Sequence, residues 1–438
     1  MASGVDGLIS GMDTTALISQ LLQAEAAPQR QLKKSVTDNQ SAINAYQAIN
    51  GKYLAALTAA KALSGDDPLT ASTNAWRSAK AVSSSGSVSA AATAGATPGT
   101  LTFNVDRLAA AQMSTAVVDP AGPVTTGAGL DLTIGSGPPV HIAVTTDTPQ
   151  GVADAINAAG AGVRASVVTT DQGTVLQLSA TKTGTANGFT LSGLAASATV
   201  AVPAADARIS VGDPAKGGYT LTSPTNTFSG VLQNVTLTVS KIETGVSVTV
   251  DSDAGGIADK MQAMADALNG VLGEIGKYTA YNAATKTGGP LTSDSLTRGL
   301  QQKILSQISQ GATGYGSFSK FGVQLDQDGK ITFDRAAFVA AYQADPAAVE
   351  ATATGLAQTI KGMADKVTDS TDGSLTQAIQ GRTTTLRDLN DRIADWDVRL
   401  SRRQGALQRQ FATLETTLGK LKDQSNWLSG QIASLPSS

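Results

Sequence analysis

The chain has 438 residues, of which 41% are hydrophobic but only 4% aromatic, so two to four small-residue domains are expected rather than one aromatic-filled core. The formal net charge of −3 provides no overall attraction to nucleic acid or to an acidic membrane, and no apolar run is long enough to span a bilayer. The absence of cysteine excludes disulfides, cysteine-ligated metals and cysteine nucleophiles.

The first residues, SGVDGLISGMD, are rich in glycine and precede an apolar helical stripe. Asp13 is the expected N-cap of this helix. Four apolar residues then share one helical face: Leu17, Ile18, Leu21 and Leu22. The lead has no positively charged segment, because the first basic residue is Arg30. We therefore expect that export would not involve a cleaved hydrophobic leader.

Pro28 is expected to interrupt or kink the first helix. The second helical pattern has a 3–4 alternation of apolar residues: Leu32, Val36, Ile43, Tyr46, Tyr53 and Leu57. Asn39 and Asn50 occupy the remaining positions of this seam. Polar seam residues reduce stability but fix the register and the number of partners.

Residues 76–255 change to short runs of period-two alternation, which predict strands separated by turns. The clearest runs are Leu101, Phe103 and Val105, then Val235, Leu237 and Val239, then Val246, Val248 and Val250. One helix is expected within TPQGVADAINAAG. The stretch 116–137, rich in Gly, Pro and Thr, is expected to be a crossover between domains.

Helical patterns return after Gly256. The first has coiled-coil spacing: Ile257, Met261, Met264, Leu268, Val271 and Ile275. A second carries Leu296, Leu300, Ile304 and Ile308. The segment GVQLDQDGKITFD then predicts a hairpin with Asp328 and Gly329 at its turn.

The strongest periodic signal is C-terminal, where an aliphatic residue recurs at every seventh position: Leu386, Ile393, Leu400, Leu407, Leu414, Leu421, Leu428 and Leu435. The companion seam begins with Leu389 and Trp396 and then becomes polar at Arg403. Apolar residues on the neighbouring flank take over further along the helix. The stripe therefore rotates, as expected if the neighbours of the helix change along its length.

Together these patterns predict an α+β fold in which long terminal helices form a coiled-coil leg and two β-rich head domains are inserted between them. The expected parts are a disordered or helical N-terminal leg segment at 1–35, a helical bundle at 36–75 and 256–400, a β-rich head at 76–116 and 206–255, a second head at 117–205, and a C-terminal leg helix at 401–438.

The terminal stripes have two interpretations. An intramolecular bundle core is expected for the seam residues Ile43, Tyr46, Tyr53, Leu57, Leu386, Leu389, Ile393, Trp396 and Leu400. Contact with another protein is expected at the extreme ends, which a single chain covers least easily. The residues assigned to such contacts are Leu17, Ile18, Leu21, Leu22, Leu421, Leu428, Ile432 and Leu435.

No set of residues converges on a reaction, so we expect neither an enzyme nor a cofactor. His141 is the only histidine and has no matching nucleophile, which favours an ordinary strand residue. In LDQDGKITFD an EF-hand register would place Gln324 and Arg335 at the two terminal ligand positions, which favours a hairpin turn over a metal site. The arginines of 399–409 lack interleaved aromatics, which favours a solvated or partner-facing flank over nucleic-acid binding.

Several segments, in order along most of the chain, resemble the bacterial flagellar filament cap family, also called hook-associated protein 2 or FliD. They are SGVDGLISGMDTTALISQLLQAEAAP, GTLTFNVDRLAAAQ, TLTSPTNTFSGVLQNVTLTV, GGPLTSDSLTRGLQQKI and FGVQLDQDGKITFDRAAFVAAYQADPAAVE. The segment TPQGVADAINAAGAGVRASVV resembles the Ile-Asn module of flagellins and hook-associated proteins, with Ile156 and Asn157 on its helix. Leu268 and Asn269 depart from a common Tyr-Asn pair, which we expect to alter helix packing and not function.

The resemblance implies a homo-oligomeric ring at the tip of the flagellar filament. Such a ring prevents loss of flagellin and promotes its folding and insertion. The implied partners are flagellin, hook–filament junction proteins and an export chaperone for the C-terminal helix, without nucleic acid or membrane insertion. The implied location is extracellular, after type III export without a cleaved signal peptide.

Two rival functions use other features of the sequence. An adhesin would bind host or environmental glycans through the heads, but such sites usually need exposed aromatics. Trp396 and Trp427 lie on the C-terminal helix, which leaves Trp76 near the heads. The other rival is a filament subunit, such as a flagellin or a junction protein.

Overall fold

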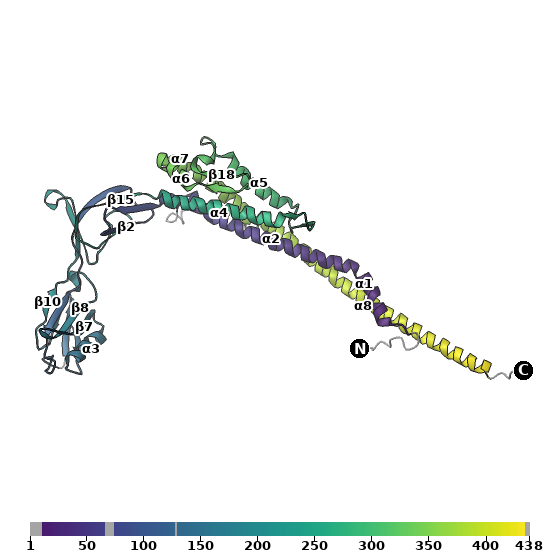
Figure 1. Ribbon diagram of the computed structural model, residues 1–438, viewed down its shortest axis with the longest axis horizontal. Coiled ribbons are helices and arrows are strands. Elements are labelled where there is room, and N and C mark those ends of the chain that lie inside the picture. Colours follow the sequence, from purple (N-terminus) through teal and green to yellow (C-terminus); the bar gives the residue numbers. More distant parts are fainter. Residues whose placement is uncertain (1–10, 66–73, 128, 434–438) are drawn as a thin grey trace. The chain divides into compact units, whose positions relative to one another are not determined.

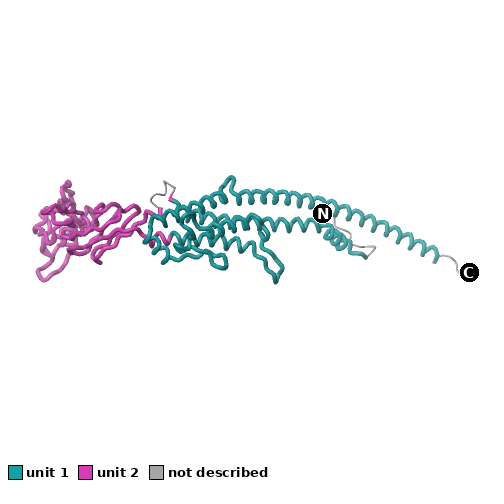
Figure 2. Tube along the Cα trace, turned by 90° about the horizontal axis from the view of Figure 1, so that it is seen from above, with its two compact units in different colours: residues 1–64, 260–438 teal, residues 65–259 magenta. Residues whose placement is uncertain are grey.

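The computed structural model describes residues 11–65, 74–127 and 129–433. The chain forms two compact units, one of residues 1–64 and 260–438 and the other of residues 65–259 (Figure 2). Within the described ranges, no helix is both long enough and apolar enough to cross a membrane.

The first unit is mainly helical. Its helices are α1 (Thr14–Glu25), α2 (Ala27–Ser64), most of α4 (Ala254–Thr279), α5 (Ser295–Gln310), α6 (Arg335–Ala344), α7 (Pro346–Thr368) and α8 (Ser374–Ala433). Long α2 packs along α7 and α8, and α1 follows it on α8 (Figure 1). The predicted boundaries at 35/36 and 400/401 both fall inside continuous helices.

Aspartate side chains cap the N-termini of several of these helices. Asp13 Oδ1 accepts a hydrogen bond from the Ala16 amide at 2.7 Å, as the sequence predicts for the start of α1. Asp294, Asp334 and Asp345 cap α5, α6 and α7 in the same way. Each carboxylate satisfies backbone donors that the first turn of a helix leaves unpaired. The helix is interrupted between α1 and α2 at Ala26, two residues before Pro28.

Two small hairpins and an aromatic cluster complete the helical unit. The hairpins pair β16 (Tyr281–Asn282) with β17 (Thr287–Gly288), and β18 (Val323–Leu325) with β19 (Ile331–Phe333). The second is the hairpin predicted at Asp328 and Gly329, and Gly329 has a φ of +75° that suits glycine. Beside it, a 3-10 helix (Phe318–Phe321) contributes Phe321, whose ring meets Phe338 edge to face at 6.3 Å.

The second unit contains two β-rich cores. The first lies between a five-stranded sheet of order β1-β15-β3-β11-β12 and a three-stranded sheet of order β13-β14-β2. The strands are β1 (Ala79–Ser83), β2 (Val88–Ala92), β3 (Gly99–Arg107), β11 (Ala207–Val211), β12 (Tyr219–Ser223), β13 (Thr227–Ser229), β14 (Val235–Val239) and β15 (Glu243–Ser252). Alternate residues of β14 and β15 are buried, as their period-two pattern predicts.

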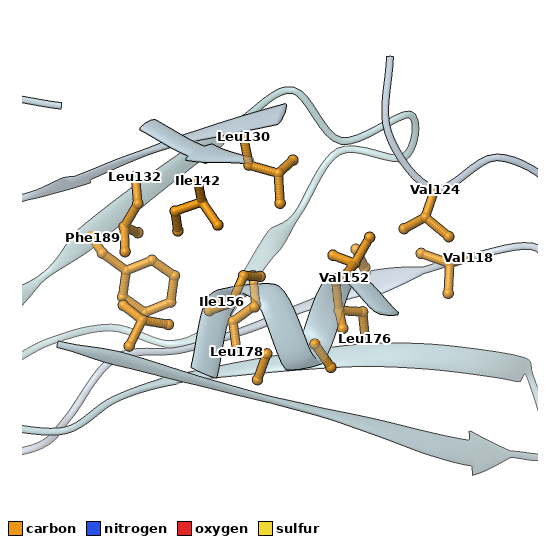
Figure 3. Packing of buried hydrophobic residues seen from close by; sticks show 14 of the residues in the cluster. Val118, Val124, Leu130, Leu132, Ile142, Val152, Ile156, Leu176, Leu178 and Phe189 are labelled. Atoms are coloured by element: carbon orange, nitrogen blue, oxygen red, sulfur yellow. The ribbon is translucent and has the colours of Figure 1, made fainter. Parts of the chain in front are cut away.

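The second core lies among α3 (Pro149–Ala159), a four-stranded sheet of order β10-β4-β8-β7 and a three-stranded sheet of order β6-β5-β9 (Figure 3). The strands are β4 (Met113–Val117), β5 (Gly129–Ile134), β6 (Val140–Ala143), β7 (Val163–Thr170), β8 (Gly173–Ala180), β9 (Phe189–Ser192) and β10 (Thr199–Val202). The stretch 116–137, expected to be only a crossover, therefore contains β5, whose Leu130 and Leu132 belong to this core.

Candidate partner-binding helices and the Ile-Asn module

The N-terminal stripe divides into a covered half and an exposed half. Helix α1 packs against α8, and Ile18 is only 8% exposed, with Leu22 half-buried. Leu17 and Leu21 lie on the adjacent i, i+4 row and are 37% and 48% exposed. The four residues therefore do not present one outward face, because α8 covers only one of their two rows. Contact of Ile18 with another protein stays a prediction that requires α1 to leave α8.

The C-terminal stripe is covered at first and exposed further along α8. Leu389 and Leu407 are buried, whereas Leu421, Leu428 and Ile432 are 56%, 53% and 62% exposed. Leu414 and Trp427 are also exposed. Leu435 lies outside the described residues. Burying side chains of this size from half exposure is worth about 1 kcal/mol each, so the end of α8 is a surface that gains from a partner.

The predicted coiled-coil seam lies within the helical unit. On α2, Ile43, Tyr46 and Tyr53 are buried and Leu57 is half-buried. On α8, Leu389 is buried, and its seam neighbours Leu386, Ile393, Trp396 and Leu400 are half-buried. The buried surface of α2 is wider than one seam. Helix α2 also packs against α7, and residues outside the seam such as Ile49 and Leu63 are buried too.

A series of polar contacts, here called the polar ladder, joins α1 and α2 to α8. The Glu25 carboxylate accepts from Arg403 Nε at 3.2 Å, and Gln29 Nε2 donates to Asp397 Oδ1 at 2.6 Å. Further along, Arg382 donates to Asn39 Oδ1 at 3.1 Å. Residue numbers rise on one side and fall on the other, so the ladder records an antiparallel register. Asn39 is thus one of the two seam asparagines expected to fix register, and its partner is now identified.

Tyr46 continues the ladder to α5. Its hydroxyl donates to Asp294 Oδ2 at 2.7 Å, and the Arg382 guanidinium carbon lies 5.9 Å from its ring centroid. Burial raises the pKa of the Tyr46 hydroxyl, and the adjacent Asp294 carboxylate raises it further. Tyr46 therefore remains a neutral donor at physiological pH.

Asn50 and Tyr53 are the same residue types as Asn39 and Tyr46 and lie on the same seam of α2, but the hydrogen bonding of their side-chain oxygens differs. The Asn50 Oδ1 and the Tyr53 hydroxyl are buried without a hydrogen-bond partner among the described residues. Burial also raises the pKa of Tyr53. An unsatisfied buried polar atom costs about 1–3 kcal/mol, so this part of the bundle is less stable than its packing alone suggests.

The Ile-Asn module anchors α3 to the strand that follows it. Ile156 is fully buried between the two sheets (Figure 3). Asn157 Nδ2 donates to the Ala165 carbonyl at 2.8 Å, and its Oδ1 accepts from the Ala165 amide at 2.9 Å. Ala165 lies on β7, an edge strand of the four-stranded sheet. Asn157 therefore satisfies backbone groups that the edge would otherwise leave open.

Three family models match the chain. The flagellar hook-associated protein 2 N-terminus matches residues 10–112, and the C-terminus of the same family matches residues 204–423. The flagellin hook IN motif matches residues 130–182, which include Ile156 and Asn157. The three matches follow the chain in the same order as the segments that resemble this family.

Three curated hook-associated proteins are 25–28% identical to this chain over the residues that align. The B-type flagellar hook-associated protein 2 of Pseudomonas aeruginosa is 25% identical over 99% of this chain and 98% of that protein. The flagellar hook-associated protein 2 of Escherichia coli K12 is 26% identical over 97% of both. The lateral flagellar hook-associated protein 2 of Vibrio parahaemolyticus is 28% identical over 62% of this chain and 63% of that protein.

Among solved structures, the D1-D2-D3 domains of the flagellar cap protein FliD from Escherichia coli are similar to this chain. The similarity has a TM-score of 0.55 and 23% identity, and it covers 77% of this chain and 99% of that one. At this identity the comparison shows a shared fold.

Proposed function

The chain belongs to the flagellar hook-associated protein 2 family, and on that premise we propose that it caps the flagellar filament. The cap is an oligomer at the filament tip that prevents loss of flagellin and promotes flagellin folding and insertion. The observation that carries the proposal is the family match at both ends of the chain, 10–112 and 204–423. A structural role of this kind needs no enzymatic activity.

The uncovered end of α8 supports a specific role for the terminal helices. We propose that Leu421, Leu428 and Ile432 bind flagellin or a junction protein, as an apolar helix face binds a complementary groove. On α1, Leu17 and Leu21 are already exposed and would join this surface. Ile18 and Leu22 would take part only after α1 separates from α8.

Further partners follow from the same surface and the same family. Before assembly the exposed residues at the end of α8 would need protection, and we propose an export chaperone for this helix. We also propose that the chain reaches the filament tip through the flagellar export apparatus without cleavage of a signal peptide. Neither proposal is required for the capping role itself.

The adhesin alternative has no support from the comparisons. Trp76, the tryptophan that the sequence places near the heads, is only 8% exposed. A buried indole cannot stack on a sugar ring from solvent. We therefore propose no second function.

The test of the α8 surface compares substitutions on one helix in a strain that lacks this chain. Leu421→Gln and Leu428→Gln should each release more flagellin into the medium, because each removes apolar contact area while retaining a good helix former. Val398→Gln is the matched control, since Val398 is 51% exposed on α8 but does not belong to the stripe. Equal flagellin loss from all three variants, at equal protein levels, would contradict a specific role for the stripe.

A further inference from the structure

The four-stranded sheet of the second unit exposes an unusual amount of apolar surface. Of the eight large hydrophobic side chains that are exposed among the described residues of this unit, four lie on this sheet: Val117, Val168, Val200 and Val202. Val117, Val175 and Val168 face one another in register across β4, β8 and β7. Arg164 is the one charged residue in the four strands.

The five-stranded sheet of the same unit has a different exposed side. Arg208 Nε lies 3.2 Å from Asp106 Oδ2, and Lys80 is opposite Asp251 in the register of β1 and β15. Charges on strands oppose unwanted pairing with other chains. The four-stranded sheet has almost none of this protection, so its edges are the better candidates for association.

The free edge at β7 has a defined position. Thr170 and Gly173 flank the two-residue turn between β7 and β8 and are paired in register. Ala165, an odd-numbered residue of β7, turns its amide and carbonyl away from β8 to Asn157. Because backbone direction alternates along a strand, the amides and carbonyls of Val167 and Thr169 point to the same open edge.

The other edge, at β10, can be placed in the same way. The Ala180 amide donates to the Gln112 carbonyl, and the Val118 amide donates to the Thr174 carbonyl, so even-numbered residues of β4 bond to β8. Odd-numbered residues such as Thr115 therefore bond to β10, where Thr199 is the partner of Thr115. Because backbone direction alternates, the next residue, Val200, turns its backbone groups away from β4, and a register shift follows between Val200 and Val202. All four residues of β10 are exposed and uncharged.

At both edges, the residue whose backbone groups point outward has its side chain on the same face of the sheet. Val167 packs against the core, and Val200 is the register partner of Ser114, which is 2% exposed. Both residues therefore lie on the core side of the sheet and turn their backbone groups outward. An antiparallel pair between β7 and β10 of two copies would continue the sheet without exchanging its faces.

We propose that β10 of one copy pairs antiparallel with β7 of a second copy, with Val200 opposite Val167 and Thr199 opposite Val168. The contact joins two different edges, so each copy keeps one free edge for a further copy. Repetition closes into a ring when the rotation between copies allows it. The inference rests on the proposed cap function, which requires an oligomer, and it specifies the contact between copies.

Introduced cysteines provide a direct test, because the chain has none of its own. The pair Val168 and Thr199 would be non-hydrogen-bonded, with Cα atoms about 4.5 Å apart, within disulfide range. Under mild oxidation, an equimolar mixture of full-length Val168→Cys and Thr199→Cys should form a disulfide-linked dimer. The double variant should form a ladder of higher oligomers. Each single variant alone should link at least about tenfold more slowly.

Two controls fix the register and the face. Ser166→Cys mixed with Thr199→Cys moves one sulfur by two residues, roughly 7 Å along the strand, and should link at least about tenfold more slowly. Gln177→Cys, at the centre of the exposed face of the sheet, should not link to itself. In addition, Val200→Lys should weaken self-association about tenfold or more, and Val200→Thr should preserve it.

Three outcomes would overturn the inference: a chain that is monomeric at every concentration, oligomers that fail to link Val168→Cys to Thr199→Cys, or efficient self-linking of Gln177→Cys. The cap function is scored separately, by flagellin retention in cells. If the unmodified chain retains flagellin but the cysteine pair does not link, the edge contact fails and the cap function stands. If the cysteine pair links but the unmodified chain does not retain flagellin, the edge contact stands and the cap function fails.

Discussion

At the scale of single residues, amide side chains bind both backbone groups of a strand residue at three places in the part of the chain that the structure describes. Asn157 does so with Ala165, Asn269 with Ile331, and Gln112 with Phe189. Each side chain substitutes for a neighbouring strand at a point where the sheet provides none. The neighbouring Leu268 is buried, and an effect of this departure on helix packing but not on function stays a prediction.

Replacing Asn157 tests the importance of such a clamp. Asn157→Leu should increase amide hydrogen exchange at Ala165 by about ten- to a hundredfold, because an unsatisfied buried amide and carbonyl cost about 1–3 kcal/mol. Gln150→Ala is the control on the same helix, since Gln150 bonds only to the exposed Asp154. Unchanged exchange at Ala165 in Asn157→Leu would show that water replaces the clamp without cost.

The two seam tyrosines of α2 make a matched pair. Tyr53→Phe should raise the free energy of unfolding of the helical unit by about 1 kcal/mol, because it removes a buried hydroxyl that has no partner. Tyr46→Phe should lower it by a similar amount, because it removes the bond to Asp294. Chemical denaturation followed by the helical signal measures both. Effects of the same sign in the two variants would contradict this assignment of the hydroxyls.

At the scale of elements, one carboxylate connects β15 to the turn before β2. The Ser87 and Ser85 hydroxyls donate to Glu243, with the Ser85 bond at 2.7 Å. These bonds, Ser87 first, hold the pKa of the Glu243 carboxyl below its ordinary value of 4.5. A carboxyl whose pKa is lower in the folded chain stabilises the fold above its unfolded pKa, and this stabilisation is lost as the pH falls through the folded pKa.

The pH dependence can be isolated with Glu243→Gln. This variant should be less stable than the unmodified chain at pH 6, and the difference should shrink as the pH falls below about 4.5. Thermal unfolding of both proteins across this range measures the difference. Glu350→Gln, on an exposed part of α7, controls for the loss of one negative charge. A difference that is constant from pH 6 to pH 3 would exclude the Glu243 carboxylate as its source.

Individual helices and strands are the part of the fold that the local hydrophobic pattern of the sequence predicts best. Period-two alternation in Val235–Val239 predicts both the strand and its buried face. The C-terminal heptad likewise predicts α8. Its seven-residue spacing includes both the buried Leu407 and the exposed Leu421, so the spacing does not predict which positions are buried. Where α8 loses its cover depends on the lengths and ends of other helices, which the heptad does not encode.

Contacts between distant residues were beyond sequence reasoning. The polar character of Asn39 predicts a register-fixing role, but its partner Arg382 lies 343 positions away. Likewise, the apolar stripe of α1 does not distinguish buried Ile18 from exposed Leu17, because both suit the same helix face. Only the position of α8 separates their two rows.

At the scale of the whole molecule, the two units present different surfaces. In the helical unit, the polar ladder fixes α1 and α2 on α8, and the apolar stripe at the end of α8 remains exposed. In the β-rich unit, one sheet carries charge pairs and the other carries exposed valines and open edges. We propose that the first surface binds the filament and that the second joins copies of the chain.

The measurement that tests the capping role most directly is flagellin partitioning in a strain that lacks this chain. Without the chain, cells should shed monomeric flagellin and lack filaments, and adding the purified chain should restore filament growth. The account predicts that the unmodified chain restores growth and that Leu421→Gln with Leu428→Gln does so poorly. Normal filaments in the absence of the chain would contradict the capping role.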